Sequence, residues 1–248
     1  MMNKRVTITI ATCIAFLLMF TMFSLNASAS AYWLEVSGSG KVNEAVTIQV
    51  CYGSIDDYGV RQRDTGKELK LTGDFKFFVT LSDGNREEIQ LHPKKDCWEG
   101  SFLPRANGIY HIAGINDKHP VVDRSKSGGI NEKPVDYLCA DYTVGNGTLL
   151  DKPTQQLDII THYEGRKVII KTYNNGSPAA SGTKLRVFNP DNWEKELTLD
   201  EHGEATFVPT IKGLYIIRQD WIDKTAGTYL GTAFADTRYR CNYCLKFE

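Results

Sequence analysis

The stretch S101-F-L-P-R-A-N-G-I-Y-H-I-A113 returns later in the chain as T206-F-V-P-T-I-K-G-L-Y-I-I-R218. The two copies share Phe, Pro, Gly, Tyr and Ile at a constant offset of 105 residues. Upstream, residues 79–91 match residues 187–199 at an offset of 108. A three-residue difference in one intervening turn explains the change of offset, and turns absorb such differences at small entropic cost. The repeat therefore predicts two copies of one structural unit.

Each residue type shared by the two copies of the repeat has a structural role. The Phe points inward near the end of a strand, and the Pro two positions later stops strand pairing. The Gly adopts the positive φ of a turn, and the Tyr begins the next strand with a buried ring whose hydroxyl reaches the turn backbone. This arrangement is similar to the tyrosine corner of Ig-like sandwiches. We interpret eight residues as structural on this basis: Phe102, Pro104, Gly108, Tyr110, Phe207, Pro209, Gly213 and Tyr215.

The rest of the chain alternates between apolar and polar residues in short runs, as in A45-V-T-I-Q-V50 and V168-I-I-K-T-Y173. Turn signals such as S82-D-G-N85 separate the runs, and helical periodicity is nearly absent. These patterns are typical of all-β sandwiches. We predict two tandem Ig-like antiparallel β-sandwich domains after an N-terminal signal peptide, with domain limits of 31–148 and 155–248. The Gly- and Pro-containing segment between them supplies a linker at 149–154.

The N-terminus has the pattern of an export signal. Lys4 and Arg5 precede a long apolar run that ends in N26-A-S-A-S-A31, which predicts a signal peptide over residues 1–29 and a periplasmic or extracellular protein. An uncleaved membrane anchor is the alternative. No second apolar run of spanning length follows, so we expect no membrane span after cleavage. Without Lys4 and Arg5 the chain carries 27 basic and 30 acidic residues, a balance that disfavours nucleic-acid binding.

Five cysteines follow the signal, and the export route favours disulfide formation for some of them. A disulfide between Cys51 and Cys97 across the first sandwich is one expectation, and burial as reduced thiols is the other. C241-N-Y-C244 has the Cys-x-x-Cys spacing of metal and redox sites. It lies in an alternating run, however, where residues three apart point to opposite faces of a strand. Structural, metal-binding and redox roles all stay open for Cys241 and Cys244.

His111 and His119 lie on either side of Asp117 in the segment that follows the first tyrosine corner. These three side chains are candidates to converge at one end of the sandwich and hold a divalent ion, while solvent-exposed histidines on a strand are the alternative. By alternation His111 faces away from Tyr110. No nucleophile, phosphate-loop or dinucleotide motif is present, so the sequence does not predict an enzyme.

Three stretches together resemble domain-of-unknown-function family 4198 of exported bacterial proteins. They are A31-Y-W-L-E-V36, the A-D-Y-T-V-G that ends at Gly145, and the segment from Gly176 to Pro209. Members are described as periplasmic components of nickel or cobalt uptake. The second half is also similar to carboxypeptidase-regulatory-like Ig-type domains. Members often carry a histidine ahead of the Trp at the mature N-terminus, and S30-A-Y-W33 has none, so the resemblance transfers no ligand to a numbered position.

The resemblance implies an exported cell-envelope binding protein that serves as an accessory component of nickel or cobalt uptake. Its implied cofactor is Ni or Co, and its implied partner is a membrane transporter subunit. The alternative function is a non-catalytic adhesion or carbohydrate-binding module, suggested by the sandwich repeat and by aromatic segments such as D220-W-I-D223 and T228-Y-L230.

Overall fold

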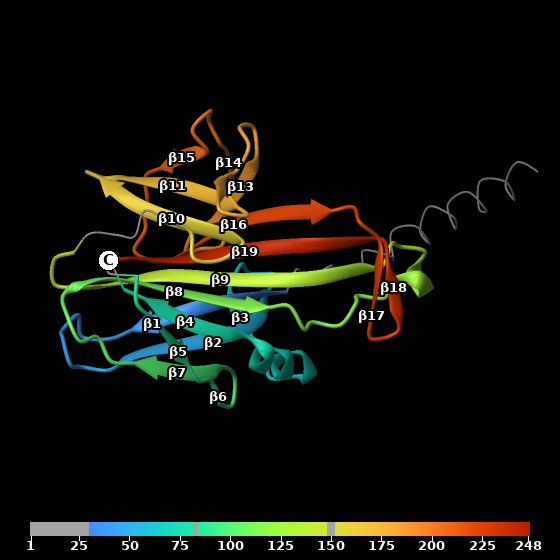
Figure 1. Cartoon of the computed structure of the whole chain (residues 1–248), viewed down its shortest axis with the longest axis horizontal. Helices are drawn as coiled ribbons and strands as arrows, with labels where there is room; N and C mark the ends of the chain where they lie inside the picture. The colour runs from blue at the N-terminus through green and yellow to red at the C-terminus, as the bar shows by residue number, and fades with distance from the viewer. Residues whose placement is uncertain (1–29, 82–83, 148–151) are drawn as a thin grey trace, which may run out of the picture.

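The computed structural model describes residues 30–81, 84–147 and 152–248, and strands make up most of them (Figure 1). The predicted signal peptide lies outside the described residues. No helix in the described part of the chain has the length and apolar character needed to cross a membrane. The elements before residue 148 are β1 (Ala31–Ser37), β2 (Val46–Ile55), β3 (Arg61–Arg63), η1 (Lys67–Asp74), β4 (Lys76–Thr80), β5 (Arg86–Ile89), β6 (His92–Pro93), β7 (Trp98–Phe102), β8 (Gly108–Asn116), η2 (Ser125–Ser127) and β9 (Glu132–Val144).

The second half repeats most of these strands and adds a separate hairpin, β17 with β18, before its last strand. Its elements are β10 (Leu157–Glu164), β11 (Lys167–Asn174), β12 (Ser177–Pro178), β13 (Lys184–Phe188), β14 (Glu194–Thr198), β15 (Glu204–Phe207), β16 (Gly213–Asp223), β17 (Gly227–Tyr229), β18 (Thr232–Phe234) and β19 (Asp236–Phe247).

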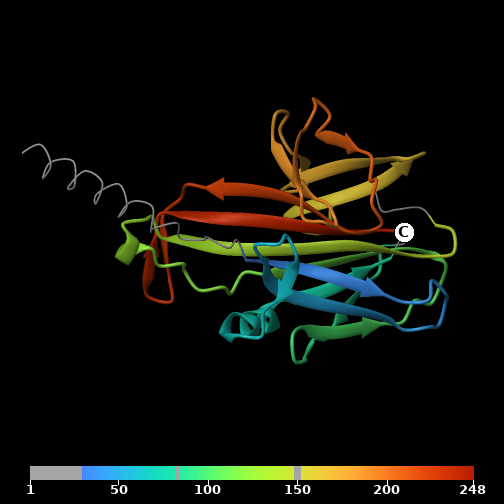
Figure 2. The same ribbon diagram turned by 180° about the vertical axis from the view of Figure 1, so that it is seen from behind.

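A central sheet of eight strands in the order β14-β13-β16-β19-β9-β8-β4-β5 runs through the molecule. Two smaller sheets pack against it. One contains β1, β2, β7 and β6 with β3, and the other contains β10, β11 and β12 with β15. Figures 1 and 2 show them on opposite sides of the long strands β9 and β19. The all-β sandwich class predicted from alternation is thus confirmed, and the molecule has three sheet layers with a core between each pair of neighbours.

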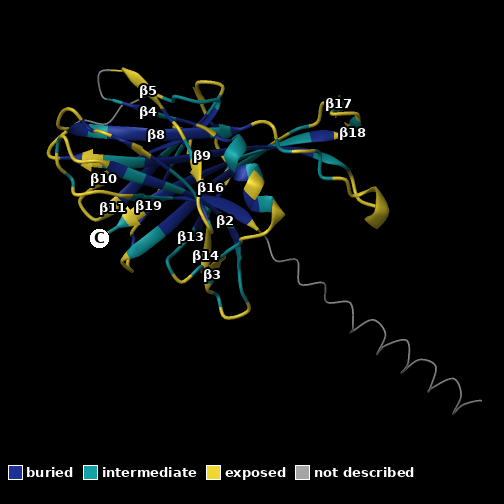
Figure 3. Cartoon of the chain, turned by 90° about the horizontal axis from the view of Figure 1, so that it is seen from below, coloured by how far each residue is buried: buried dark blue, intermediate teal, exposed yellow. Residues whose placement is uncertain are grey.

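Strands β9 and β19 contribute to both cores by alternation. On β9, Leu138 and Ala140 point into the first core, whereas Tyr137 and Cys139 point into the second. On β19, Cys244 belongs to the first core, and its neighbours Tyr243 and Leu245 belong to the second. Strands buried on both faces have few polar residues, and Figure 3 shows the middle of the molecule as a continuous buried region.

The pairing of β9 with β19 is parallel, from Glu132 opposite Asp236 to Cys139 opposite Tyr243. This pair joins the two sandwiches into one sheet and departs from the purely antiparallel, tandem arrangement expected from the sequence. Local alternation cannot predict it, because a parallel pair between distant segments requires no particular turn between them. The predicted domain limits of 31–148 and 155–248 fall between β9 and β10, and the division into two domains stays a prediction.

The internal repeat appears as matched tyrosine corners. Tyr110 Oη donates a hydrogen bond to the carbonyl oxygen of Ala106 at 2.8 Å and accepts one from the amide of Ala106 at 3.1 Å. Tyr215 Oη accepts hydrogen bonds from the amides of Thr210 at 3.1 Å and Ile211 at 3.0 Å. Both hydroxyls thus hold the turn that precedes their strand.

The other repeat residues surround these corners in the same way. The ring of Phe102 lies 5.6 Å from that of Tyr110, and the ring of Phe207 lies 5.7 Å from that of Tyr215. Pro104 and Pro209 are buried two residues beyond the ends of β7 and β15. Gly108 and Gly213 have positive φ values of 157° and 136°, which a residue with a Cβ rarely adopts.

Candidate metal site

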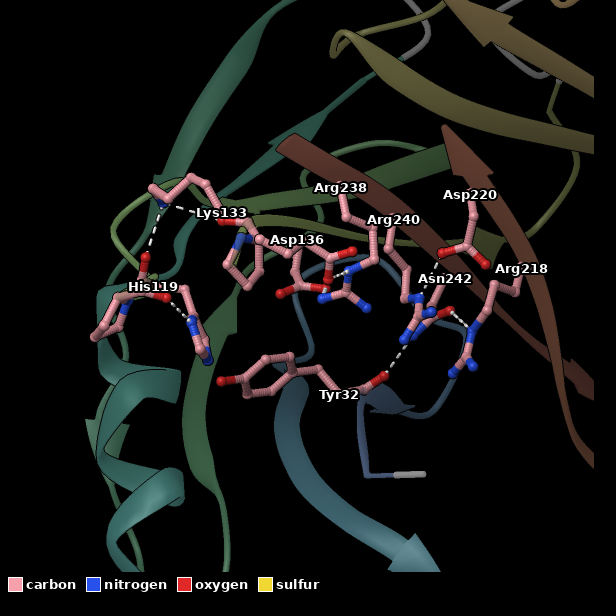
Figure 4. A network of polar contacts seen from close by, with 12 residues as sticks. Tyr32, His119, Lys133, Asp136, Arg218, Asp220, Arg238, Arg240 and Asn242 are labelled. Atoms are coloured by element: carbon pink, nitrogen blue, oxygen red, sulfur yellow. Dashed lines mark hydrogen bonds and ion pairs between the residues drawn. The ribbon is translucent and has the colours of Figure 1, made fainter. Parts of the chain in front are cut away.

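The structure does not bring His111, Asp117 and His119 together. His111 lies on β8, is 3% exposed, and occupies the face of the central sheet opposite to Tyr110. His119 lies in the loop after β8, where its Nδ1 is 2.7 Å from the carbonyl oxygen of Pro120. The carbonyl oxygens of Asp117 and His119 accept hydrogen bonds from the ammonium of Lys133, at 2.7 and 2.8 Å (Figure 4). A bound ammonium repels a metal ion, so the expected site does not form in this loop.

Cys241 and Cys244 lie on opposite faces of β19, as the alternation of the strand requires. The sulfur of Cys244 accepts a hydrogen bond from the amide of Leu34 at 3.1 Å in the first core. The sulfur of Cys241 is buried in the second core, 3.5 Å from that of Cys139 on β9. The two residues of the Cys-x-x-Cys motif therefore do not share a ligand.

Cys51 and Cys97 are free, buried thiols in the structure, which differs from the expected disulfide. The antiparallel pairing of β2 with β7 ends at Val50 opposite Trp98. Cys51 follows Val50 and Cys97 precedes Trp98, so the two cysteines lie on neighbouring segments. The Cys51 thiol lies 3.9 Å from a carboxylate oxygen of Glu35. Burial, and then the charge of Glu35, raise the pKa of Cys51, which keeps the thiol protonated and unreactive.

A cluster of polar side chains that the sequence did not predict surrounds His111 between the two sandwiches. His111 Nδ1 is 2.6 Å from Asp141 Oδ1, and Asp141 is the cross-strand partner of His111 on β9. On the other side of the ring, Nε2 is 3.3 Å from Oδ1 of Asp158, which lies on β10 and is fully buried. This second contact lacks hydrogen-bond geometry, so Nε2 is a buried nitrogen without a hydrogen-bond partner.

The thiol of Cys139 completes a set of possible metal ligands. An imidazole nitrogen of His111, the sulfur of Cys139 and a carboxylate oxygen of Asp158 lie within 4.8 Å of one another. All three residues are buried, and the sulfur of Cys241 lies 3.5 Å from that of Cys139. Nitrogen, sulfur and oxygen donors in this combination suit zinc and neighbouring divalent ions such as nickel and cobalt.

The distances in the cluster are compatible with tetrahedral coordination. Two ligand atoms about 2.0–2.1 Å from a zinc ion are about 3.3 Å apart in a tetrahedron, and His111 Nε2 and Asp158 Oδ1 are 3.3 Å apart. Two sulfurs at about 2.3 Å from the ion would be about 3.8 Å apart, close to the 3.5 Å between Cys139 and Cys241. The residues present therefore fit a divalent ion with three protein ligands, and Cys241 lies outside this set although its sulfur is near that of Cys139.

A second set of hydrogen bonds orients the possible ligands. Asp141 holds His111 Nδ1 with one oxygen, and its other oxygen accepts a hydrogen bond from Tyr243 Oη at 2.9 Å. Tyr243 Oη in turn accepts a hydrogen bond from Thr161 at 2.9 Å. A carboxylate on the far nitrogen of a histidine is the usual support of a metal-bound imidazole, because it fixes the tautomer and the ring orientation.

Hydrogen bonds also hold the carboxylate of Asp158 in place. Its Oδ2 accepts hydrogen bonds from the amide and hydroxyl of Thr154, at 2.7 and 3.2 Å, and its Oδ1 accepts one from the amide of Ile159 at 2.9 Å. Burial opposes ionisation of Asp158, but the neighbouring His111 and these donors hold the pKa of its carboxyl below the usual value. The carboxylate is therefore charged and in place without a metal ion.

The negative charge around His111 affects the pKa of its imidazole. Burial alone would lower the pKa of this imidazole, yet Asp158 and then Asp141 raise it well above its usual value. For Cys139, burial and the contact with Cys241 raise the pKa of the thiol. Without a metal ion the cluster thus contains an imidazolium and two thiols, and a divalent cation would take the place of their protons.

The site lies behind the wall of a large groove. The groove has a volume of about 1330 Å³ and is lined by residues of β1, β9, β10, β16 and β19. Asp141, Thr161 and Tyr243 belong to its lining, whereas His111, Cys139 and Asp158 lie deeper. The supporting hydrogen bonds therefore separate the possible ligands from the groove.

Comparisons with known proteins do not assign the chain to a family. No family model matches the chain, and no curated protein matches it. Among solved structures, the chicken interferon gamma receptor alpha chain aligns at 12% identity and a TM-score of 0.23, covering 89% of this chain and 99% of the receptor chain. Dimeric latent PorU from Porphyromonas gingivalis aligns at 10% identity and a TM-score of 0.22, covering 86% of this chain and 20% of PorU. TM-scores this low support no inference about function.

Proposed function

We propose that this protein binds one divalent transition-metal ion in the cell envelope, through His111, Cys139 and Asp158. The observation that carries the proposal is the convergence of an imidazole nitrogen, a thiol sulfur and a carboxylate oxygen within 4.8 Å in a buried position. His111 Nε2 is buried and makes no hydrogen bond, although Asp158 Oδ1 lies 3.3 Å away as an ion-pair partner. A metal ion bound to both atoms would replace this ion pair.

A purely structural ion cluster is the competing interpretation of the same residues. An imidazolium between Asp141 and Asp158 would neutralise part of their charge without a metal ion. In that interpretation the thiols of Cys139 and Cys241 are packing residues of the second core. Sulfur ligands favour nickel, cobalt and zinc over calcium or magnesium, so the site chemistry agrees with the metals named for the resembling family.

The physiological role we propose is accessory to nickel or cobalt uptake, with a membrane transporter subunit as the partner. Support comes from the export signal predicted over residues 1–29 and from the resemblance of three stretches to exported nickel and cobalt uptake components. The ion is cargo in this role. Its ligands lie behind the hydrogen bonds of Asp141 and Tyr243, so release requires those contacts to open.

Isothermal titration calorimetry of the mature, reduced protein with Ni²⁺, Co²⁺ and Zn²⁺ tests the proposal. We expect one ion per chain, and at least a hundredfold weaker binding for His111→Gln, Cys139→Ser and Asp158→Asn. His119→Gln is a matched control, because His119 lies outside the cluster. Absence of binding up to high micromolar metal, or binding that survives all three substitutions, would refute the proposal.

A carbohydrate-binding or adhesion role is the second candidate, and the groove is the observation in its favour. Three tyrosines line the groove, Tyr142, Tyr163 and the buried Tyr243, and Tyr163 is 50% exposed. Exposed aromatic rings in a large groove provide the stacking surface that sugar rings use. A glycan array with the mature protein tests this role, and an array without any bound glycan would remove it.

A further inference from the structure

Three arginines gather on the face of the central sheet that is opposite to the second core. Arg186 on β13, Arg218 on β16 and Arg240 on β19 alternate along their strands with the core residues Leu185, Ile217 and Cys241. Asp220 on β16 is the carboxylate that Arg186 and Arg240 share, and Arg218 lies beside it without a direct contact. Positive charge therefore exceeds negative charge at this place.

Both carboxylate oxygens of Asp220 already accept a hydrogen bond, each from a different one of these arginines. Its Oδ2 accepts a hydrogen bond from Arg186 at 2.9 Å, and its Oδ1 accepts one from Nε of Arg240 at 2.6 Å. Each carboxylate oxygen thus already has a charged partner. Arg186 also approaches Glu194, but only to 3.9 Å.

Arg218 has no carboxylate of its own. Its Nε donates a hydrogen bond to the neutral amide oxygen of Asn242 at 2.8 Å, and Asn242 is fixed by its own hydrogen bond to the carbonyl oxygen of Tyr32. The guanidinium lies 5.1 Å from the ring centre of Phe188. Within the described residues, its terminal nitrogens make no hydrogen bond (Figure 4).

Burial makes this arrangement costly. Arg218 is only 6% exposed, and a buried guanidinium needs both a counter-charge and hydrogen-bond acceptors. Burial, and then repulsion from Arg240, lower the pKa of Arg218 to about 9, even though Asp220 is nearby. The terminal nitrogens of Arg218 bond to no group of the described residues and are not among the fully buried atoms without a partner, so an anion could reach them and supply acceptors.

We propose that Arg218 and Arg240, with Arg186 at the edge, form a binding site for an oxyanion group. Guanidinium groups bind phosphate, sulfate and carboxylate groups through paired N–H···O hydrogen bonds. The ligand is a small oxyanion or the anionic group of a larger molecule. The site lies on the opposite face of β19 from Cys241, so it is separate from the metal ligands.

A neighbouring arginine on the same strand has two carboxylates within ion-pair distance, although its Nε makes no hydrogen bond. Arg238 lies on β19 with its Nε 3.3 Å from Glu132 and a terminal nitrogen 3.6 Å from Asp136. Two carboxylates lie near this one guanidinium, whereas Arg186 and Arg240 share Asp220 and Arg218 contacts no carboxylate of the described residues. Arg238 is therefore the matched control for the proposed anion site.

The experiment measures the thermal unfolding midpoint of the mature protein in an anion-poor buffer with added phosphate, sulfate or acetate. Chloride at equal ionic strength controls for general screening. We expect at least one oxyanion to raise the midpoint by several degrees at millimolar concentration, because a ligand that binds only the folded state stabilises it. Phosphate and sulfate without acetate would identify a tetrahedral ligand, and acetate alone would identify a carboxylate.

Variants decide whether Arg218 is responsible. Arg218→Met and Arg240→Gln should lose the oxyanion-specific shift, and Arg238→Gln should keep it. Without added anion, Arg218→Met should unfold at the same temperature as the wild type or higher, because it removes a poorly compensated charge. If Arg218→Met does not fold, Arg186→Gln replaces it and should weaken oxyanion binding at least threefold. Equal shifts with chloride and oxyanions, or an unchanged shift in Arg240→Gln, would overturn the proposal.

Discussion

His111 links the folding free energy of the metal-free protein to pH. Its buried ring lies between Asp141 and Asp158, and these carboxylates raise its pKa well above the value of about 6.5 in an unfolded chain. The bound proton therefore stabilises the folded state fully below about pH 6.5. The contribution disappears as the pH rises toward the folded-state pKa, because the folded protein holds a proton that the unfolded chain has lost.

Urea unfolding of the chelator-treated, reduced protein between pH 6 and pH 9 measures this effect. We expect the His111 contribution to the free energy of unfolding to fall by about 1.4 kcal/mol per pH unit above about pH 6.5. His111→Gln should remove this slope, while His162→Gln should keep it, because the side chain of His162 is 40% exposed. The same slope in His111→Gln as in the wild type would contradict this description of the ring.

Part of this site could be predicted at the residue scale. Alternation from Tyr110 correctly places His111 on the other face of its strand, and a hairpin between β8 and β9 suggests a partner near Asp141. Asp158 and Cys241 could not be connected to His111, because they lie on strands of the other half of the chain. Asp117 and His119 are close in sequence to His111, but their loop folds around Lys133. Proximity in sequence is a poor guide to ligand sets in β-sandwiches.

At the scale of elements, the two tyrosine corners perform the same task with different hydrogen bonds. Tyr110 bonds to the amide and carbonyl of Ala106, and Tyr215 accepts from two successive amides. The pattern F-x-P-x-x-x-G-x-Y carries enough local information to predict both corners. Turn, strand start and ring contact all lie within about ten residues, so tertiary context adds little.

Removal of each hydroxyl tests the equivalence of the corners. Tyr110→Phe and Tyr215→Phe should each lower the free energy of unfolding by about 1–3 kcal/mol, because buried backbone groups lose their partner while the ring contact remains. Chemical denaturation of the variants measures the effect, with Tyr58→Phe as a control at a position 92% exposed. A loss in one corner and none in the other would show that the repeat is not equivalent in stability.

For the whole molecule, the parallel pairing of β9 with β19 is the feature that local patterns do not specify. Two antiparallel sandwiches could follow each other as separate domains, and the alternating sequence predicts that much. Strand β9 nevertheless has long stretches without an exposed residue, and β19 has a similar stretch near its end. Burial on both faces is typical of a strand inside a larger sheet. The sequences of both strands nevertheless contain charged residues such as Asp136, Arg238 and Arg240, so composition alone does not reveal that the two halves share a sheet.

Separation of the halves tests this pairing. Residues 30–147 and 152–248 produced alone should aggregate or unfold, since each would expose a long unpaired strand and part of the other half's core. Produced together, they should form a 1:1 complex in size-exclusion chromatography. A first half that is monomeric and unfolds cooperatively by itself would mean that the seam between the sandwiches is dispensable.

The proposed metal site depends on the association of the two halves. His111 and Cys139 come from the first half, and Asp158 and the neighbouring Cys241 come from the second. Visible and near-ultraviolet absorption of the Co²⁺-loaded mature protein examines the site most directly. We predict intense visible bands of four-coordinate cobalt and a near-ultraviolet thiolate band, with the thiolate band lost in Cys139→Ser. A wild-type spectrum like that of cobalt in water, or a thiolate band that persists in Cys139→Ser, would contradict the proposed site.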